Sequence, residues 1–167
     1  VSSFGLSGCG IGSRAASQSE VIEQESARVN AWFQERYDDG LARSPMSQTY
    51  LGLGSNKSRL DDSSALARDE DAALSEAWLK DMKADFDYDK LDEVSQLSYR
   101  LYEYAGKDDL AQHQFADHAY VFQHMSGPHT DFPSFLINFH NVESVADAKA
   151  YISRIAASPA YMEGYQS

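Results

Sequence analysis

The five histidines are the residues from which catalytic or metal-binding chemistry in this chain would start. The sequence has no His-Glu-x-x-His pair, the spacing that sets two imidazoles of one helix on a single zinc ion. His113 and His118 lie five positions apart, about 140° around a helix, and cannot share an ion on an unbroken helix. We therefore assign no catalytic residue and no metal ligand within this chain.

His124, His129 and His140 flank a short apolar run at positions 132–139. The ordinary interpretation is that each forms hydrogen bonds within a connection. The functional interpretation, which we keep for His124 and His129, is that these two side chains line a cleft.

An acidic turn at Asp85, Asp87 and Asp89 has the first three ligand positions of a calcium loop. The loop would require glycine where Lys90 stands and a bidentate glutamate where Gln96 stands. The pattern therefore favours a turn between helices, and we expect no calcium site of micromolar affinity.

Cys9, the only cysteine, follows small and apolar residues in the uncharged leader VSSFGLSGCGIG. The run LSGC resembles a bacterial lipobox, in which the cysteine is lipidated and becomes the mature N-terminus. A longer signal peptide would then precede it. Gly10 stands where an aspartate would favour the inner membrane, so the prediction is an outer-membrane lipoprotein facing the periplasm and anchored through Cys9. The alternative is a flexible leader with an incidental thiol.

The charge of the chain limits its partners. Twenty-six acidic and 14 basic residues give a net charge of −12. Binding to nucleic acid requires a basic patch, so we expect no nucleic-acid partner. The hydrophobic content of 43% indicates a folded chain, and no apolar span of about 20 residues is present to cross a bilayer.

Apolar spacing predicts an all-α fold of antiparallel helices. Ser17 and Glu20 have capping-box spacing, and the first helix should end near Gly40, since glycine suits a C-terminal cap. A Ser144 cap starts the last full helix. Further helices are expected at 62–84, 92–115 and 144–157, with connections at 43–59, 85–89 and, irregular, around 123–143.

The helix faces expected to point inward follow from the same spacing. They carry Val21, Ile22, Val29, Trp32, Phe33 and Tyr37; then Leu66, Leu74, Ala77, Trp78 and Met82; then Val94, Leu97, Leu101, Tyr104 and Phe115; and finally Val145, Ala148, Tyr151, Ile152 and Ile155.

The end of the sequence contains a further helix signal. Ser158-Pro159 has the pattern of a new cap with proline in the first turn, with little chain left to complete a helix. We therefore interpret residues 1–16 as a leader and residues 17–167 as the N-terminal helical region of a larger helical protein.

Several short runs together resemble a bacterial family catalogued as domain of unknown function 885. The resemblance covers about residues 28–163. It rests on NAWFQERY at 30–37, DYDKLD at 87–92, LSYRLYEY at 97–104, PSFLIN at 133–138 and DAKAYI at 147–152.

The resemblance implies a long, nearly all-helical protein, often a lipoprotein, similar to helical zinc metallopeptidases of the carboxypeptidase type. The zinc motif of such proteins lies in their C-terminal half, and none of its ligands maps onto this chain. The expectation is therefore a cleft wall or lid, inactive alone. Its partners would be the C-terminal remainder of the polypeptide and a peptide substrate, with zinc in the full-length protein. The alternative is a helical binding lipoprotein without chemistry.

Overall fold

The computed structural model describes residues 17–118 and 120–166. Every regular element within these ranges is a helix, which confirms the all-α class. The α-helices are α1 (Gln18–Arg43), α2 (Pro45–Tyr50), α3 (Ala65–Asp85), α4 (Glu93–His113), α5 (Pro128–Asn138) and α6 (Val145–Gly164), and two 3₁₀ turns are η1 (Tyr88–Lys90) and η2 (Ala116–His118).

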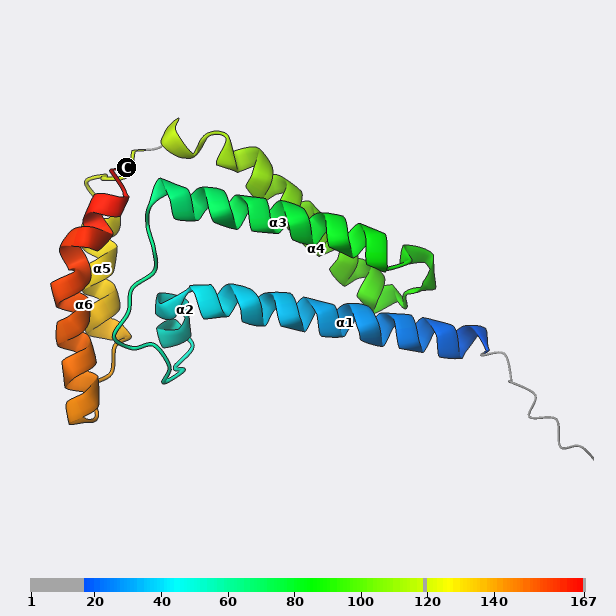
Figure 1. Cartoon of the computed structure of the whole chain (residues 1–167), viewed down its shortest axis with the longest axis horizontal. Coiled ribbons are helices and arrows are strands. Elements are labelled where there is room, and N and C mark those ends of the chain that lie inside the picture. Colours follow the sequence, from blue (N-terminus) through cyan, green and yellow to red (C-terminus); the bar gives the residue numbers. More distant parts are fainter. Residues whose placement is uncertain (1–16, 119, 167) are drawn as a thin grey trace, which may run out of the picture.

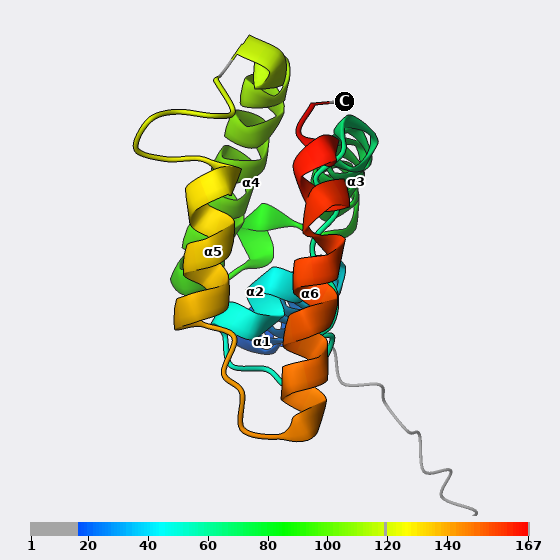
Figure 2. The same cartoon turned by 90° about the vertical axis from the view of Figure 1, so that its left-hand side faces the viewer.

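The helices form two groups that meet at α2. Helices α1, α3 and α4 run along the long axis in alternating directions, and the turn containing η1 joins α3 to α4 (Figure 1). Helices α5 and α6 lie side by side and antiparallel across one end of this group (Figure 2). The short helix α2 sits at the corner between the two groups.

The first core is aromatic and joins α1, α3 and α4. Its buried residues are Val29, Trp32, Leu79, Met82, Phe86, Leu91 and Tyr99. The Trp32 ring meets Phe86 at 6.0 Å and Tyr102 at 5.3 Å between centroids, both edge-on. Gly106 lets α4 continue against α3, because a Cβ there would lie 2.9 Å from Leu79 Cδ1.

The second core joins α2, α5 and α6. Met46, Phe132, Phe135 and Leu136 are buried, with Leu60, Tyr151, Tyr161 and Met162 packed against them. The apolar run at 132–139 is therefore core, as expected. Ile137 and Phe139, however, are exposed, at 76% and 44%.

The start of α1 is confirmed and its end is corrected. The Ser17 N–H donates to Glu20 Oε2 at 2.6 Å, and the Glu20 N–H donates to Ser17 Oγ at 3.3 Å, so the capping box is present. The helix continues through Gly40 to Arg43 and ends only at Ser44, which caps α2 in turn. The expected connection 43–59 thus contains a helix, with Pro45 at its first position, where a missing N–H has no cost.

The irregular connection predicted around 123–143 is wrong in its middle. Residues 128–138 form α5, and only the flanking segments are irregular. The Gly127-Pro128 pair starts a helix here instead of breaking one. Gly127 has φ +129°, which favours glycine, and a Cβ there would lie 2.5 Å from Val121 O; Pro128 then occupies the first helical position.

The new helix predicted at Ser158 is also wrong, because α6 runs unbroken through Pro159. A proline inside a helix leaves the carbonyl four residues earlier without its N–H donor. Ser158 Oγ donates to that carbonyl, Ile155 O, at 2.8 Å and so replaces the lost bond. The Ser158-Pro159 pair is therefore a position inside one helix where a side chain replaces the missing backbone donor. The expectation of a larger protein then rests on the family resemblance alone.

The inward positions predicted for Tyr37 of α1 and Leu66 of α3 are wrong, because both side chains are exposed. The predicted inward face of α4 is wrong as well. Val94, Leu97, Leu101, Tyr104 and Phe115 are all exposed, whereas Ser95 and Tyr99 are buried. On α6, Val145, Ile152 and Ile155 are exposed, and Arg154 is fully buried. Both helices carry apolar residues on more than one face, so spacing alone cannot tell which face a neighbour covers. As for membrane crossing, none of the described helices combines the required length and apolar character.

Candidate functional site

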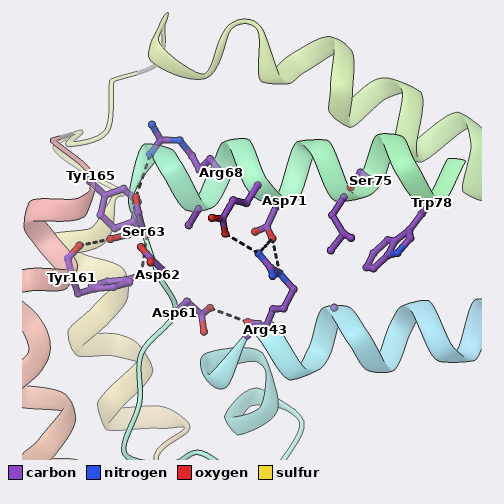
Figure 3. Close-up of a pocket in the computed structure, with 15 residues that line it drawn as sticks. Arg43, Asp61, Asp62, Ser63, Arg68, Asp71, Ser75, Trp78, Tyr161 and Tyr165 are labelled. Atoms are coloured by element: carbon purple, nitrogen blue, oxygen red, sulfur yellow. Dashed lines mark hydrogen bonds and ion pairs between the residues drawn. The ribbon is translucent and has the colours of Figure 1, made fainter. Parts of the chain in front are cut away.

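The candidate site is a cavity of about 630 Å³ where the C-terminal end of α1, the start of α3 and the end of α6 converge (Figure 3). Its lining is Gly40, Arg43, Ser44, Asp61, Asp62, Ser63, Ala67, Arg68, Glu70, Asp71, Leu74, Ser75, Trp78, Tyr161 and Tyr165. The Ser17, Ser64 and Ser144 caps fix where α1, α3 and α6 begin and hence how their side chains are aimed.

Aromatic rings form opposite ends of the cavity. Trp78 projects from α3, while Tyr161 and Tyr165 are one turn apart on α6, with their hydroxyl oxygens 2.9 Å apart. Burial raises the pKa of the Tyr161 hydroxyl well above its usual range, and the Tyr165 hydrogen bond adds to this. Tyr161 therefore stays protonated at physiological pH and cannot serve as a base.

The lining has more carboxylates than guanidinium groups. The four carboxylates are Asp61, Asp62, Glu70 and Asp71, and the two guanidinium groups are Arg43 and Arg68. Arg43 donates to Asp71 at 2.7–2.8 Å and lies 3.8 Å from Glu70. The cavity therefore carries a net negative charge, which favours a cationic ligand.

Asp61 and Asp62 also hold the local backbone. Asp61 accepts hydrogen bonds from Ser44 Oγ and the Met46 N–H, each at 2.8 Å, and so fixes the start of α2. Asp62 accepts the Ser64 N–H at 3.0 Å, a bond that lowers the pKa of its carboxyl. Asp62 is exposed, and this hydrogen bond comes from a residue of its own segment. It is therefore the carboxylate best placed to meet a ligand.

A second hollow, of about 670 Å³, adjoins the cavity through the shared residues Arg68, Tyr161 and Tyr165. It extends the surface toward Asp117 and Pro128. Arg68 stands between the two, donating to Ser63 O at 3.2 Å and lying 3.6 Å from Asp117. The two hollows together offer space for an extended ligand.

No histidine lines the cavity, and Ser63 Oγ donates to Tyr161 O at 2.6 Å, so the lining has no Ser–His pair of the kind used for acyl transfer. In residues 17–118 and 120–166, no cluster of His, Cys, Asp and Glu could hold a metal ion. The aromatic and charged lining can hold and orient a ligand.

The sequence-predicted site residues lie elsewhere. Cys9 is outside the described residues. His124 lies in an exposed bend, and His129 lies exposed in the first turn of α5 with its ring 5.6 Å from Phe122. Neither lines the two hollows, and their role in a cleft stays a prediction. Sequence reasoning missed Tyr161 and Tyr165, although their i, i+4 spacing was a signal that they share a face.

The acidic turn has the structure expected of a helix connection. Asp87 accepts the Asp89 N–H at 3.2 Å and pairs with Lys90 at 2.7 Å, which lowers the pKa of its carboxyl. Asp87 is thus the cap of η1.

Comparison with known proteins gives one match. The profile of the family described as bacterial protein of unknown function, DUF885, matches residues 45–167, most of the chain. The match begins after the NAWFQERY run. No curated protein and no solved structure matches the chain. The chain therefore belongs to DUF885, a bacterial protein family of unknown function.

Proposed function

We propose that this chain forms a non-catalytic helical wall of a ligand-binding cleft in a larger, lipid-anchored protein of the metallopeptidase type. The cavity between α1, α3 and α6 carries the proposal. Its aromatic ends and surplus carboxylates can bind a ligand, and its lining includes no pair of nucleophile and base. Such a surface orients a substrate for chemistry supplied from another part of the protein.

An extended peptide with lysine or arginine side chains, or a free amino terminus, is the ligand class that fits this lining. Carboxylates attract the cation, and Trp78 and the tyrosine rings offer faces for a cation–π contact. The adjoining hollow leaves room for the peptide to continue past Arg68.

The outer face of α4 supports the view that further helices pack on this region. Val94, Leu97, Leu101 and Tyr104 recur every three or four residues and are 74%, 49%, 58% and 72% exposed. The opposite face of α4 already packs in the first core through Tyr99. A helix that is apolar on two faces is typical of a middle layer. We propose that the C-terminal remainder of the polypeptide supplies the covering helices and, where the protein is active, the zinc site.

The membrane anchor is a separate part of the proposal and rests on the LSGC run at Cys9. Expressed with its full signal peptide, the protein should partition into detergent and fractionate with the outer membrane. Cys9→Ser should release it, because several acyl chains hold a lipoprotein stably where one does so only marginally. Equal fractionation of wild type and variant as soluble protein would refute the anchor.

Peptide binding is tested by the fluorescence of Trp78. Trp32→Phe leaves Trp78 as the single tryptophan, since the chain has two. A lysine-rich peptide should quench it saturably, and a glutamate-rich peptide of equal length should not. Asp62→Asn should weaken binding about two- to fivefold, the range expected for one exposed charge.

The control is Asp81→Asn, which removes an exposed carboxylate of α3, the helix that follows Asp62, outside the cavity lining. It should leave the affinity unchanged. If no saturable binding occurs, or if both variants weaken binding alike, the cavity is not the peptide site.

The second candidate function is a binding lipoprotein without chemistry, favoured by the same absence of a base in the cavity lining. Metal analysis and peptidase assay of the full gene product separate the two. Stoichiometric zinc with hydrolysis supports the metallopeptidase type, and peptide binding without either supports the binding protein.

A further inference from the structure

Arg154 of α6 is a fully buried cation in the second core. Its guanidinium donates to Arg59 O at 2.8 Å, to Pro45 O at 3.2 Å, to Thr49 Oγ1 at 2.8 Å and to His140 Nδ1 at 3.0 Å. All four acceptors are neutral groups. The guanidinium carbon also lies 4.9 Å from the centroid of the Phe135 ring. One side chain thus ties α6 to α2, α5 and the connection that leads to α3.

The contacts of His140 fix its protonation state. Arginine can only donate, so Nδ1 must carry a lone pair. Nε2 lies 3.3 Å from Asp147 O, and a carbonyl can only accept, so Nε2 must carry the proton. Both contacts require the same neutral tautomer. A second proton on Nδ1 would place an N–H against the guanidinium and a cation beside a cation.

We propose that Arg154 and His140 form a latch that holds α6 against α2 at neutral pH and that acid releases. Protonated His140 can no longer accept from Arg154, and the buried guanidinium then loses one of its four acceptors while gaining a like charge at 3.0 Å. The contact that opens is the one between Arg154 and the carbonyls of Pro45 and Arg59. Pro45 is next to Ser44 in the chain, and Arg59 is two residues before Asp61; both Ser44 and Asp61 line the cavity.

The charges around the pair do not offset this effect. Burial and then Arg154 lower the pKa of His140 from its ordinary 6.5, and Lys57 acts in the same direction. The hydrogen bond to the Asp147 carbonyl and, more weakly, the Asp147 carboxylate act against this lowering. That carboxylate is bound to Lys57 at 2.8 Å and to Ser144 at 2.7 Å. Asp61, the carboxylate that favours the charged form of Arg154, is occupied by Ser44 and Met46. The neutral ring of Tyr151 packs nearly perpendicular to the His140 ring, with 5.1 Å between the two centroids.

The sign of the pH dependence follows. The folded state favours neutral His140, so the latch is at full strength above pH 6.5 and weakens as the pH falls toward the lowered pKa. Within that window, the equilibrium for opening rises by up to about tenfold per pH unit.

Hydrogen exchange of the full chain at pH 7.5 and pH 5, corrected for intrinsic rates, tests the latch. Wild type should lose protection in α2 at pH 5, while α3 and the first turns of α4 keep theirs. His140→Asn leaves an acceptor near the position of Nδ1 that cannot be protonated, so the protection of α2 should become independent of pH. The control His118→Asn, at an exposed histidine, should behave as wild type.

Unchanged protection of wild-type α2 at pH 5, or an equal loss in His140→Asn, would overturn the latch. If His140→Asn does not fold, ¹⁵N spectra of the wild-type imidazoles decide. The latch requires His140 to be neutral with its proton on Nε2 at pH 7.5 and to titrate together with α2 protection. A proton on Nδ1 at pH 7.5 would exclude it.

Discussion

The two cores of this protein achieve their stability in different ways. The first core, between α1, α3 and α4, consists of apolar and aromatic side chains whose contacts are edge-on and tolerant of small shifts. The second core, between α2, α5 and α6, is built around Arg154, whose hydrogen bonds require particular acceptors at particular places. Burial is non-directional, whereas a buried charge is tolerated only while its partners stay in position.

This difference has consequences for sensitivity. A change of shape in the first core should be absorbed in part by neighbouring rings. A change of charge or hydrogen-bonding geometry in the second core should not be absorbed by its neighbours, because each buried polar group that loses its partner has a desolvation cost. The second core also reaches the cavity wall through Tyr161 of α6, and Ser44, the cap of α2, lines the cavity as well, so the integrity of this core bears on the site.

The largest effect is expected for Arg154→Met, which removes the donor to Arg59 O, Thr49 Oγ1 and His140 Nδ1, while Pro45 O keeps the Thr49 hydroxyl. The free energy of unfolding should fall by about 3–5 kcal/mol, because each buried acceptor left unpaired costs about 1–3 kcal/mol. Arg154→Lys should restore little, because lysine lacks the planar fork. Denaturant titration measures both, and full rescue by lysine would contradict the geometric account.

Met82→Ala should have the next largest effect, in the first core. Met82 is fully buried, and its truncation leaves a cavity that should lower the free energy of unfolding by about 2–5 kcal/mol. The matched variant Met82→Leu keeps the volume and should cost less than about 1.5 kcal/mol. Equal losses from both variants would show that this core depends on specific geometry as well.

Acid should act on the second core also through Asp147, whose pKa is lowered to about 2, chiefly by the bond to Lys57. A lowered carboxylate pKa stabilises the fold above pH 3.8 and loses that contribution as the pH falls toward 2. Asp147→Asn should remove this part of the acid transition, measured by circular dichroism between pH 5 and 2. Asp81→Asn is the control and should leave the transition in place.

The smallest effect on stability is expected for Leu101→Asn in the exposed stripe of α4. The free energy of unfolding should change by no more than about 0.5 kcal/mol, as at other surface positions. Binding of a hydrophobic dye and self-association should decrease, because the variant interrupts an exposed apolar patch. The neighbouring exposed variant Arg100→Asn should leave dye binding unchanged. If Leu101→Asn destabilises the fold strongly, the stripe is not an outer surface.

The site shows the same division between local and tertiary information as the fold. Trp78 was expected to point inward from its helical spacing, and it does line the cavity. The hydrogen bond from Ser63 Oγ to Tyr161 O and the position of Asp61 at the start of α2 join residues far apart in the chain, which no spacing rule predicts. His140 and Arg154 illustrate this most clearly, because an arginine in an amphipathic helix is ordinarily a surface residue.

By itself, the sequence determined the helical class, the Ser17 and Ser144 caps, the helix start near Asp92, and most of the apolar run of α5 as core, because caps and short-range periodicity depend on residues within a turn or two. Only the tertiary structure decided which face of α4 packs, whether Gly127-Pro128 starts a helix, and how Pro159 is accommodated in α6. The reason is physical. A helix with two apolar faces has two orientations of similar local energy, and the neighbours that bury one of them come from distant parts of the chain.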